Sequence, residues 1–279
     1  MKKISFFKMN GSGNDFILID NRDCALGGLN LSKFAKTICQ RNFSVGADGL
    51  ILIEDSEIAD FKWQFFNADG SVAEMCGNGG RCAARFACII GIGGEKLSFE
   101  TKAGVIKAEI SESVVKLEMT EPSGMVLDTI ILFGEDKHTL HSINTGVPHV
   151  VELVEKLDNF DLVHVGRFIR NHDQFLPEGT NVNFIKVLNP SNIRIRTYER
   201  GVEDETLACG TGSIASALIA SCKDLVNSPV LVHTQGGEIL KVHFNKEEGE
   251  FKEIFLEGYA KIVYEGKIWE ENFREKNDD

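Results

Sequence analysis

Two cysteines stand in matching sequence contexts. The segment Cys76-Gly-Asn-Gly79 recurs 133 positions later as Cys209-Gly-Thr-Gly212. In each copy a run of small and apolar residues with helical spacing follows, which predicts a loop that leads into a helix N-terminus. The N–H groups and the positive dipole end of such a terminus favour anions, and they favour a thiolate over a thiol. The pattern therefore predicts two reactive thiols that serve one site.

Paired thiols beside anion-binding helix ends suit one reaction in particular. Removing the α-proton of an amino acid builds negative charge on its carboxylate, and two helix N-termini would stabilise that charge as it forms. One cysteine, as thiolate, would take the proton from one face, while the other, as thiol, would deliver a proton to the opposite face. The residues thus predict an amino-acid racemase or epimerase that needs no cofactor.

The remaining cysteines and the histidines do not predict a metal site. The spacing of Cys76 and Cys82 fits none of the short cysteine pairs of zinc sites, and Cys209 lacks a near partner. The pair His138-x-x-His141 is expected to lie exposed on a hairpin. We expect the five cysteines outside the repeated motif to be small buried apolar residues. They are Cys24, Cys39, Cys82, Cys88 and Cys222.

Other uses of the glycine-rich segments are less well supported. Gly11-x-Gly13 lacks the third glycine of a dinucleotide-binding loop, and Gly77-x-Gly79-Gly80 is not followed by Lys-Ser or Lys-Thr. A Schiff-base lysine stays open, although no lysine has a singular context. A catalytically silent amino-acid-binding protein also stays open.

The bulk composition narrows the class of protein. The chain has 279 residues, of which 43% are hydrophobic and 26% charged, as in globular proteins with one large or two ordinary domains. Its 42 acidic and 30 basic residues give a net charge of −12, which argues against nucleic acid or an anionic membrane as a partner. No signal peptide or membrane span is predicted. Seven cysteines in a chain of this length indicate reduced thiols in a cytoplasm.

The cysteine repeat belongs to a longer internal duplication. Strands are predicted at 16–19 and 50–53, and the same shift of 133 places them on predicted strands at 149–152 and 183–186. Before them come a strand at 4–7 and a loop at 8–15, and a helix at 31–39 has Ser32 as its expected cap. We conclude that the chain is a tandem duplication of an α/β unit with strands around one central helix.

Seven motifs follow one another along the chain: KMNGSGNDF at 8–16, FNADG at 66–70, MCGNGGRC at 75–82, GVPH at 146–149, PEGTN at 177–181, YERG at 198–201 and ACGTG at 208–212. With them the chain resembles the cofactor-independent diaminopimelate epimerases over essentially its whole length. The resemblance implies an α/β (α+β) fold of two pseudo-symmetric duplicated domains, each a curved mixed or antiparallel β-sheet wrapped around a central helix. We expect an N-terminal domain at 1–120 and a C-terminal domain at 121–265. Whether residues 266–279 return to the N-terminal domain is left open. The site is expected in the cleft between the halves.

The resemblance also implies an activity and residue roles. The reaction is the interconversion of LL- and meso-2,6-diaminopimelate, a step toward lysine and the cell-wall cross-linking residue of bacteria. Cys76 and Cys209 correspond to the acid and base pair, and His149 and Glu199 to residues that set the protonation of the thiols. The amino-acid substrate would be bound by Asn14, Asn67, Gly77, Asn78, Asn181, Glu199, Arg200, Gly210 and Thr211. Arg200 suits a carboxylate because of its forked geometry.

Two departures from the family pattern affect the far end of the substrate. Val147 stands where many members have asparagine, and Gly49 stands where some have glutamine. Racemases of another polar amino acid, such as histidine or glutamate, share the implied fold and keep both cysteines, so they remain the alternative. The sequence leaves open which cysteine is the base under given conditions, and it leaves open the oligomeric state, a homodimer included.

Overall fold

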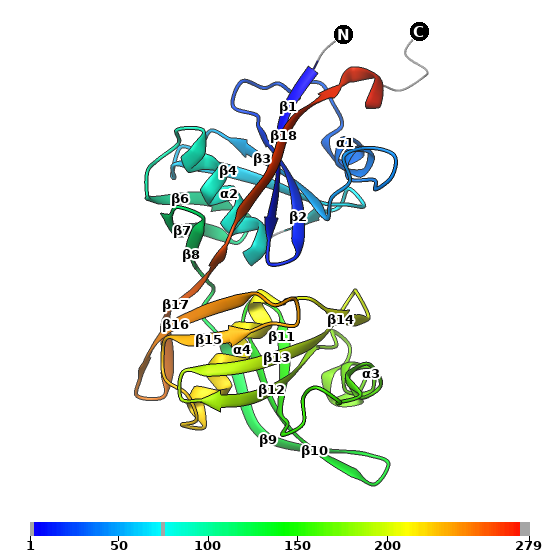
Figure 1. Ribbon diagram of the computed structural model, residues 1–279, viewed down its shortest axis with the longest axis vertical. Helices are drawn as coiled ribbons and strands as arrows, with labels where there is room; N and C mark the ends of the chain where they lie inside the picture. The colour runs from blue at the N-terminus through cyan, green and yellow to red at the C-terminus, as the bar shows by residue number, and fades with distance from the viewer. Residues whose placement is uncertain (1–2, 74–75, 274–279) are drawn as a thin grey trace. The chain divides into compact units, whose positions relative to one another are not determined.

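The computed structural model describes residues 3–73 and 76–273 (Figure 1). Met1, Lys2, Glu74, Met75 and residues 274–279 lie outside the described residues. The chain divides into two compact units: unit 1 runs to Leu117 and resumes at Gly258, and unit 2 is Glu118–Glu257. Among the described residues, no helix is long and apolar enough to cross a bilayer.

Unit 1 combines a mixed sheet with two helices. Its elements are β1 (Lys3–Gly11), β2 (Asn14–Asp20), α1 (Leu31–Ile38), β3 (Gly49–Glu54), β4 (Phe61–Asn67), β5 (Val72–Ala73), α2 (Gly77–Ile89), β6 (Lys96–Thr101), β7 (Gly104–Ser111), β8 (Val114–Glu118), β18 (Lys261–Trp269) and the short 3₁₀ helix η2 (Glu270–Asn272). Strands pair in the order β18-β1-β2-β3-β4-β6-β7-β8, and β5 pairs with β4. The pairs β2–β3 and β4–β6 are parallel, and the others are antiparallel.

Unit 2 repeats this arrangement. Its elements are β9 (Ser123–Phe133), β10 (Asp136–Asn144), β11 (Pro148–Leu153), α3 (Leu162–Arg170), the 3₁₀ helix η1 (Asp173–Phe175), β12 (Asn181–Asn189), β13 (Asn192–Glu199), β14 (Asp204–Thr206), α4 (Gly210–Cys222), β15 (Val230–His233), β16 (Ile239–Glu247) and β17 (Glu250–Tyr259). Strands pair in the order β9-β10-β11-β12-β13-β15-β16-β17, with β14 on β13 and with β11–β12 and β13–β15 parallel.

The sheet of each unit wraps around one helix. In unit 2, α4 contacts six strands (β10, β11, β12, β13, β15 and β16), and its residues from Gly212 to Ser221 are buried. In unit 1, α2 contacts β1, β2, β3, β6 and β7. Both helices consist largely of Gly, Ala, Ser and Cys, whose small side chains let strands approach from several sides. The predicted fold, two duplicated units each with a mixed sheet around a central helix, is confirmed.

The duplication extends beyond the segments in which the sequence reveals it. The two central helices begin at Gly77 and Gly210 and end at Ile89 and Cys222, so the spacing of 133 holds at both ends. The C-terminal strand β18 pairs antiparallel with β1, as β9 pairs with β10. The end of the chain therefore supplies unit 1 with the strand that β9 supplies to unit 2.

Two local predictions are wrong. The predicted loop at 8–15 is a hairpin in which Ser12 and Gly13, with φ values of 55° and 93°, form the turn between β1 and β2. Ser32 does not cap α1, because Asn30 occupies the N-cap and accepts a hydrogen bond from the Lys33 N–H at 3.1 Å. The Ser32 hydroxyl instead donates to the Gly70 carbonyl and ties α1 to the turn after β4.

Candidate active site

Cys76 is the N-cap residue of α2. Its backbone is extended, with φ −147° and ψ 116°, and its carbonyl accepts the first helical hydrogen bond from the Gly80 N–H at 2.7 Å. The side chain is half-buried. A Cβ added at Gly79 would lie 3.3 Å from Ile51 Cδ1 and 3.6 Å from Cys76 Cβ, so the glycine lets this helix end pack closely against β3. The predicted loop-to-helix setting of the first thiol is thus present.

A chain of amide side chains runs from this helix end to the β1–β2 turn. Asn78 Nδ2 donates to Asn14 Oδ1 at 2.7 Å, so two predicted substrate-binding residues are in direct contact. Arg81, which is 0% exposed, donates to Asn78 Oδ1 at 2.9 Å and to Ser12 Oγ at 2.5 Å. Sequence reasoning missed Arg81 and Ser12. The signal was an arginine near the start of a helix that consists mostly of small and apolar residues.

Beyond Asn14 lies a cluster of charged side chains that the sequence analysis also missed. Asn14 Nδ2 donates to Asp48 Oδ2 at 3.1 Å, and Arg41 bridges Asp48 at 2.9 Å and Asp15 at 2.5 Å. Lys8 forms an ion pair with Asp15 at 2.7 Å. Burial alone would raise the pKa of Asp15, but the hydrogen bonds from Arg41 and Lys8 outweigh it and lower this pKa to about 2. The cluster fixes the orientation of Asn14.

Gly49 and Asn67 face each other across β3 and β4. Asn67 is exposed at the end of its strand, and its Nδ2 donates to Ser71 Oγ at 3.0 Å. Gly49 is buried, and a Cβ there would lie 2.5 Å from Phe65 Cε2. A longer side chain at position 49 would have to displace Phe65, so packing accounts for the glycine at this departure from the family pattern.

Cys209 is the N-cap residue of α4. Its backbone has φ −124° and ψ 114°, and its side chain is 9% exposed. The Gly212 N–H donates to Cys209 Sγ at 3.4 Å, and Thr211 Oγ1 lies 3.5 Å from the same sulfur. The Ser213 hydroxyl donates to the Cys209 carbonyl at 2.8 Å. An N–H aimed at sulfur from the first turn of a helix is the arrangement that favours a thiolate.

His149 lies buried at the start of β11. It is 1% exposed, and its Nδ1 is 3.1 Å from Nδ2 of Asn183, which the sequence analysis did not single out. Burial, and secondly the charge of Arg200, lowers the pKa of His149 to about 3. His149 is therefore a neutral imidazole at ordinary pH.

Asn181, Glu199 and Arg200 meet at the ends of β12 and β13. Asn181 Oδ1 accepts a hydrogen bond from the Arg200 N–H at 2.9 Å, and Asn181 Nδ2 donates to the Pro148 carbonyl at 3.2 Å. The Arg200 guanidinium donates to the Glu178 carbonyl at 2.9 Å. Burial raises the pKa of Glu199. Because β11 and β12 place His149 opposite Asn181, these four predicted residues form one group in unit 2.

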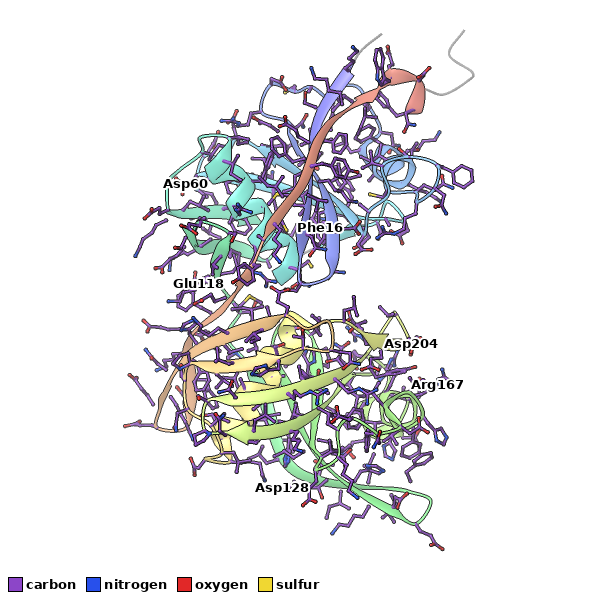
Figure 2. All side chains as sticks on the ribbon, in the orientation of Figure 1. Phe16, Asp60, Glu118, Asp128, Arg167 and Asp204 are labelled. Atoms are coloured by element: carbon purple, nitrogen blue, oxygen red, sulfur yellow. The ribbon has the colours of Figure 1, made fainter. Side chains whose placement is uncertain are left out.

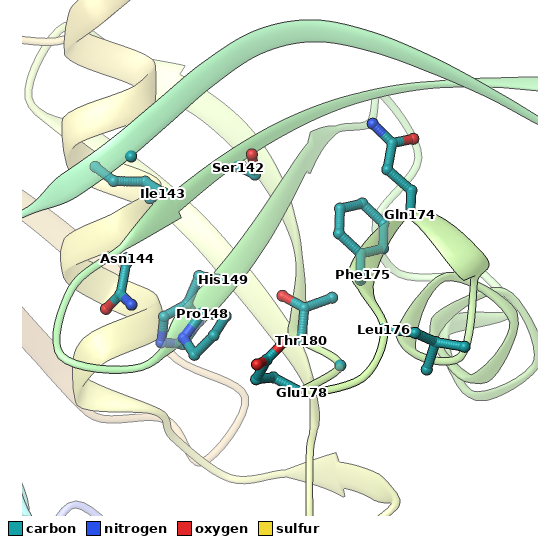
Figure 3. A pocket seen from close by; sticks show the side chains of 12 residues that line it. Ser142, Ile143, Asn144, Pro148, His149, Gln174, Phe175, Leu176, Glu178 and Thr180 are labelled. Carbon is teal, nitrogen blue, oxygen red and sulfur yellow. The ribbon is translucent and has the colours of Figure 1, made fainter.

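A pocket of about 230 Å³ opens beside this group (Figure 3). Pro148 and His149 line it from β11, Asn144 from the end of β10, and Glu178 and Thr180 from the loop before β12. The Gly146 N–H donates to Asn144 Oδ1 at 2.9 Å and shapes the turn that precedes β11. The pocket thus combines a buried imidazole with an amide and a carboxylate.

Two predictions of exposure fail outside the site. His138 and His141 do lie on a hairpin, that of β9 and β10, but they are only 7% and 2% exposed. His138 Nδ1 lies 2.9 Å from a carboxylate oxygen of Glu152, and His141 Nδ1 accepts from the N–H of Asp128, labelled in Figure 2, at 3.1 Å. These partners make burial of the two rings acceptable.

The five other cysteines divide by burial. Cys39 and Cys82 are buried as predicted, and burial raises the pKa of Cys39 to about 12. Cys88 and Cys222 are half-buried. Cys24 is exposed in a turn with φ 55°, so its predicted burial is wrong.

Known proteins similar to this chain in sequence belong to the family that its sequence motifs indicate. The sequence matches a protein-family model described as "Diaminopimelate epimerase" at residues 6–125 and 141–263. A diaminopimelate epimerase of Aquifex aeolicus is 49% identical over 96% of this chain and 99% of that protein. One from a Hydrogenobaculum species is 46% identical over 95% of this chain and 99% of that protein.

Among solved structures, a PhzF-family phenazine biosynthesis protein of Bacillus anthracis has a TM-score of 0.73 at 17% identity, over 96% of this chain and 100% of that one. A hydroxyproline epimerase of Agrobacterium vitis has a TM-score of 0.70 at 14% identity, over 96% of this chain and 92% of that chain. At these identities the structural matches support the fold alone.

Proposed function

This chain belongs to the diaminopimelate epimerase family, and we propose on that basis that it is an isomerase that interconverts LL- and meso-2,6-diaminopimelate. Identity of 49% over nearly the whole of both chains supports this assignment. The observation that carries the mechanism is the pair of cysteines at the N-caps of the two duplicated central helices.

In the proposed reaction both thiols act on one α-carbon, and no cofactor takes part. When the LL isomer is consumed, Cys209 as thiolate removes the α-proton and Cys76 as thiol returns a proton to the opposite face; the reverse reaction exchanges the roles. The Gly212 N–H at Cys209 Sγ supports the thiolate form of the base. Each inversion leaves the proton on Cys209 and Cys76 as the thiolate, so proton exchange with solvent restores the starting state, and no other reactant is consumed.

The substrate carboxylate at the reacting carbon would be held by backbone and side-chain donors of the two helix starts. These are Gly77, Asn78, Gly210 and Thr211. Helix N-termini stabilise the charge that spreads onto this carboxylate as the α-proton leaves.

The remainder of the substrate would be bound by Asn14, Asn67, Asn181, Glu199 and Arg200. The hydrogen bonds that fix Asn14, Asn78 and Asn181 support this role, because their amides are already oriented before substrate arrives. We further propose that His149 and Glu199 help to set the protonation of the thiols. The reaction would take place in the cytoplasm, where thiols stay reduced.

The decisive test is turnover of LL-2,6-diaminopimelate in deuterated water. We expect the meso product to carry deuterium at the inverted α-carbon, because the proton that Cys76 delivers comes from solvent. Histidine and glutamate, measured in parallel, should neither exchange their α-protons nor racemise. Exchange with one of these amino acids and none with diaminopimelate would reassign the substrate.

We also propose that the protein forms a homodimer. Ile262, Val263 and Tyr264 of β18 are 38%, 58% and 44% exposed, and apolar side chains gathered on one strand are typical of interfaces. Sedimentation equilibrium should give twice the chain mass of 30.9 kDa. Val263→Lys should lower that mass toward one chain, whereas Val105→Lys, at a strand position exposed to 43% in the same unit, should not. A monomeric wild type would contradict the proposal.

A further inference from the structure

Asn183 on β12 is a buried side chain at which several elements meet. It is 0% exposed. Its Nδ2 lies 2.9 Å from the Val150 carbonyl and 3.1 Å from His149 Nδ1, and its Oδ1 accepts from Thr197 Oγ1 at 3.0 Å. The helix α4 approaches so closely that a Cβ at Gly212 would lie 2.3 Å from Asn183 Oδ1. The amide is therefore held on every side.

The neighbours of this amide fix its orientation. A backbone carbonyl only accepts, so the atom that faces the Val150 oxygen must be the amide nitrogen. Rotating the amide by half a turn would bring two oxygens together at that point. Both hydrogens of Asn183 Nδ2 are then used, one toward Val150 and one toward His149 Nδ1. It follows that Nδ1 of His149 accepts, and that the neutral ring carries its hydrogen on Nε2.

The same contact disfavours a charged ring. An imidazolium donates from both nitrogens, and a hydrogen on Nδ1 would point at the hydrogens of the Asn183 amide. The charge of Arg200 acts in the same direction, and Glu178 lines the pocket on which His149 borders. Nε2 of His149 is buried and makes no hydrogen bond with the residues that the structure describes. A hydrogen on this atom is a buried donor that awaits an acceptor.

We propose that Asn183 is a positioning residue that holds His149 in the Nε2–H tautomer, so that His149 donates a hydrogen bond to an anionic group of the reaction and does not act as a proton acceptor. The identity of that anion, a thiolate or a substrate carboxylate, rests on the proposed function; the tautomer does not. The duplication supports a role beyond folding. At the equivalent positions of unit 1, 133 residues earlier, stand Phe16, labelled in Figure 2, and Leu50, both buried.

The tautomer can be read directly from ring-nitrogen chemical shifts of the full chain labelled with ¹⁵N-histidine, the signals of His149 being those lost in His149→Gln. At neutral pH we expect a pyridine-type Nδ1 and a pyrrole-type Nε2 for His149 in the wild type. In Asn183→Asp the carboxylate accepts from Nδ1–H, so Nδ1 should become pyrrole-type. A purely structural role for Asn183 would not reverse the tautomer.

A second asparagine–histidine pair supplies a matched control. Nε2 of His233 lies 2.8 Å from Oδ1 of Asn192, whose Nδ2 donates to Asn189 Oδ1 at 2.9 Å. Here the amide already presents oxygen to the ring, so His233 donates from Nε2. Asn192→Asp should keep that hydrogen on Nε2, whereas Asn183→Asp should reverse the tautomer of His149.

Kinetics add an independent readout. We expect kcat of Asn183→Asp to fall about 10- to 100-fold, by comparison with the loss seen when residues that orient metal-binding histidines are changed. The loss should deepen as pH rises. The new carboxylate favours the imidazolium form of His149, which carries a hydrogen on Nε2, and this hydrogen is lost when the ring deprotonates and keeps its hydrogen on Nδ1. An unchanged pH profile with unchanged kcat would contradict the proposal.

The outcomes separate cleanly. A pyrrole-type Nδ1 in the wild type, or a pyridine-type Nδ1 retained in Asn183→Asp, overturns the positioning role even if diaminopimelate is turned over. Failure of the wild type to turn over diaminopimelate would refute the proposed function and leave the tautomer assignment standing. Should Asn183→Asp not fold, the wild-type spectrum still decides, and Thr197→Val, which removes the donor to Oδ1, should give a mixture of tautomers.

Discussion

Cys76→Ala and Cys209→Ala are each expected to abolish the inversion of diaminopimelate while leaving the fold intact. General acid–base catalysis by one positioned group contributes about 10²- to 10⁴-fold to a rate, so each variant should lose at least that much activity. The thiol that remains can still remove a proton and return it to the same face. We therefore expect each variant to exchange the α-proton of one stereoisomer without inverting it. The stereoisomer that exchanges should differ between the two variants, because the two thiols act on opposite faces of the α-carbon. Chiral analysis of the product combined with deuterium incorporation measures both effects.

Each central helix contains a control thiol for this experiment. Cys88 lies in α2 and Cys222 lies in α4, both are half-buried, and neither stands at a helix start. Cys88→Ala and Cys222→Ala should retain kcat within about twofold, because surface and half-buried changes away from a site usually cost little. Inversion at a near wild-type rate by either N-cap variant would refute the two-thiol mechanism.

The features that could be predicted from sequence are those whose causes are local. The two cysteine loops were recognisable because glycines and helical spacing lie within a few residues of each thiol, and because the same pattern occurs twice, 133 residues apart. The central helices and most strands followed from apolar periodicity for the same reason. Ser32 shows the limit of this reasoning, since the helix begins two residues earlier than a Ser32 cap would require, at a position where Asn30 serves equally well as the cap.

Side-chain partners that are distant in sequence could not be predicted. Asn183 is 34 positions from His149 and reads in the sequence as one polar residue within an apolar strand. Arg81 and Ser12, 69 positions apart, meet only because α2 packs against the β1–β2 turn. His138 was expected on the surface because the sequence does not show that Glu152 is its partner across the sheet. In each case a buried polar group is tolerated because a remote residue satisfies it.

Gly212→Ala should be far more harmful than the same change at Gly79, although each glycine is the third residue of a central helix. At Gly212 the new Cβ would lie 2.3 Å from Asn183 Oδ1 and 3.3 Å from Cys209 Cβ. Asn183 would have to move, and leaving its buried hydrogen-bonding partners unsatisfied costs about 1–3 kcal/mol for each group. At Gly79 the nearest atom, Ile51 Cδ1, would be 3.3 Å away and can shift by a few tenths of an ångström.

Urea unfolding of both variants measures the difference. Alanine favours the helical state over glycine by about 1 kcal/mol in a helix interior, so Gly79→Ala should leave the free energy of unfolding unchanged or raise it slightly. For Gly212→Ala we expect the free energy of unfolding to fall by a net amount of about 1–3 kcal/mol, with the same helix-propensity gain already included. We also expect a marked fall in kcat, because the Gly212 N–H that faces Cys209 Sγ shifts with the helix start. Adding Asn183→Ala to Gly212→Ala removes the clash, so the double variant should be more stable than the sum of the two single losses predicts. Equal stability of Gly212→Ala and Gly79→Ala would show that Asn183 is not held as tightly as its hydrogen bonds indicate, and the tautomer of His149 would then lose its structural basis.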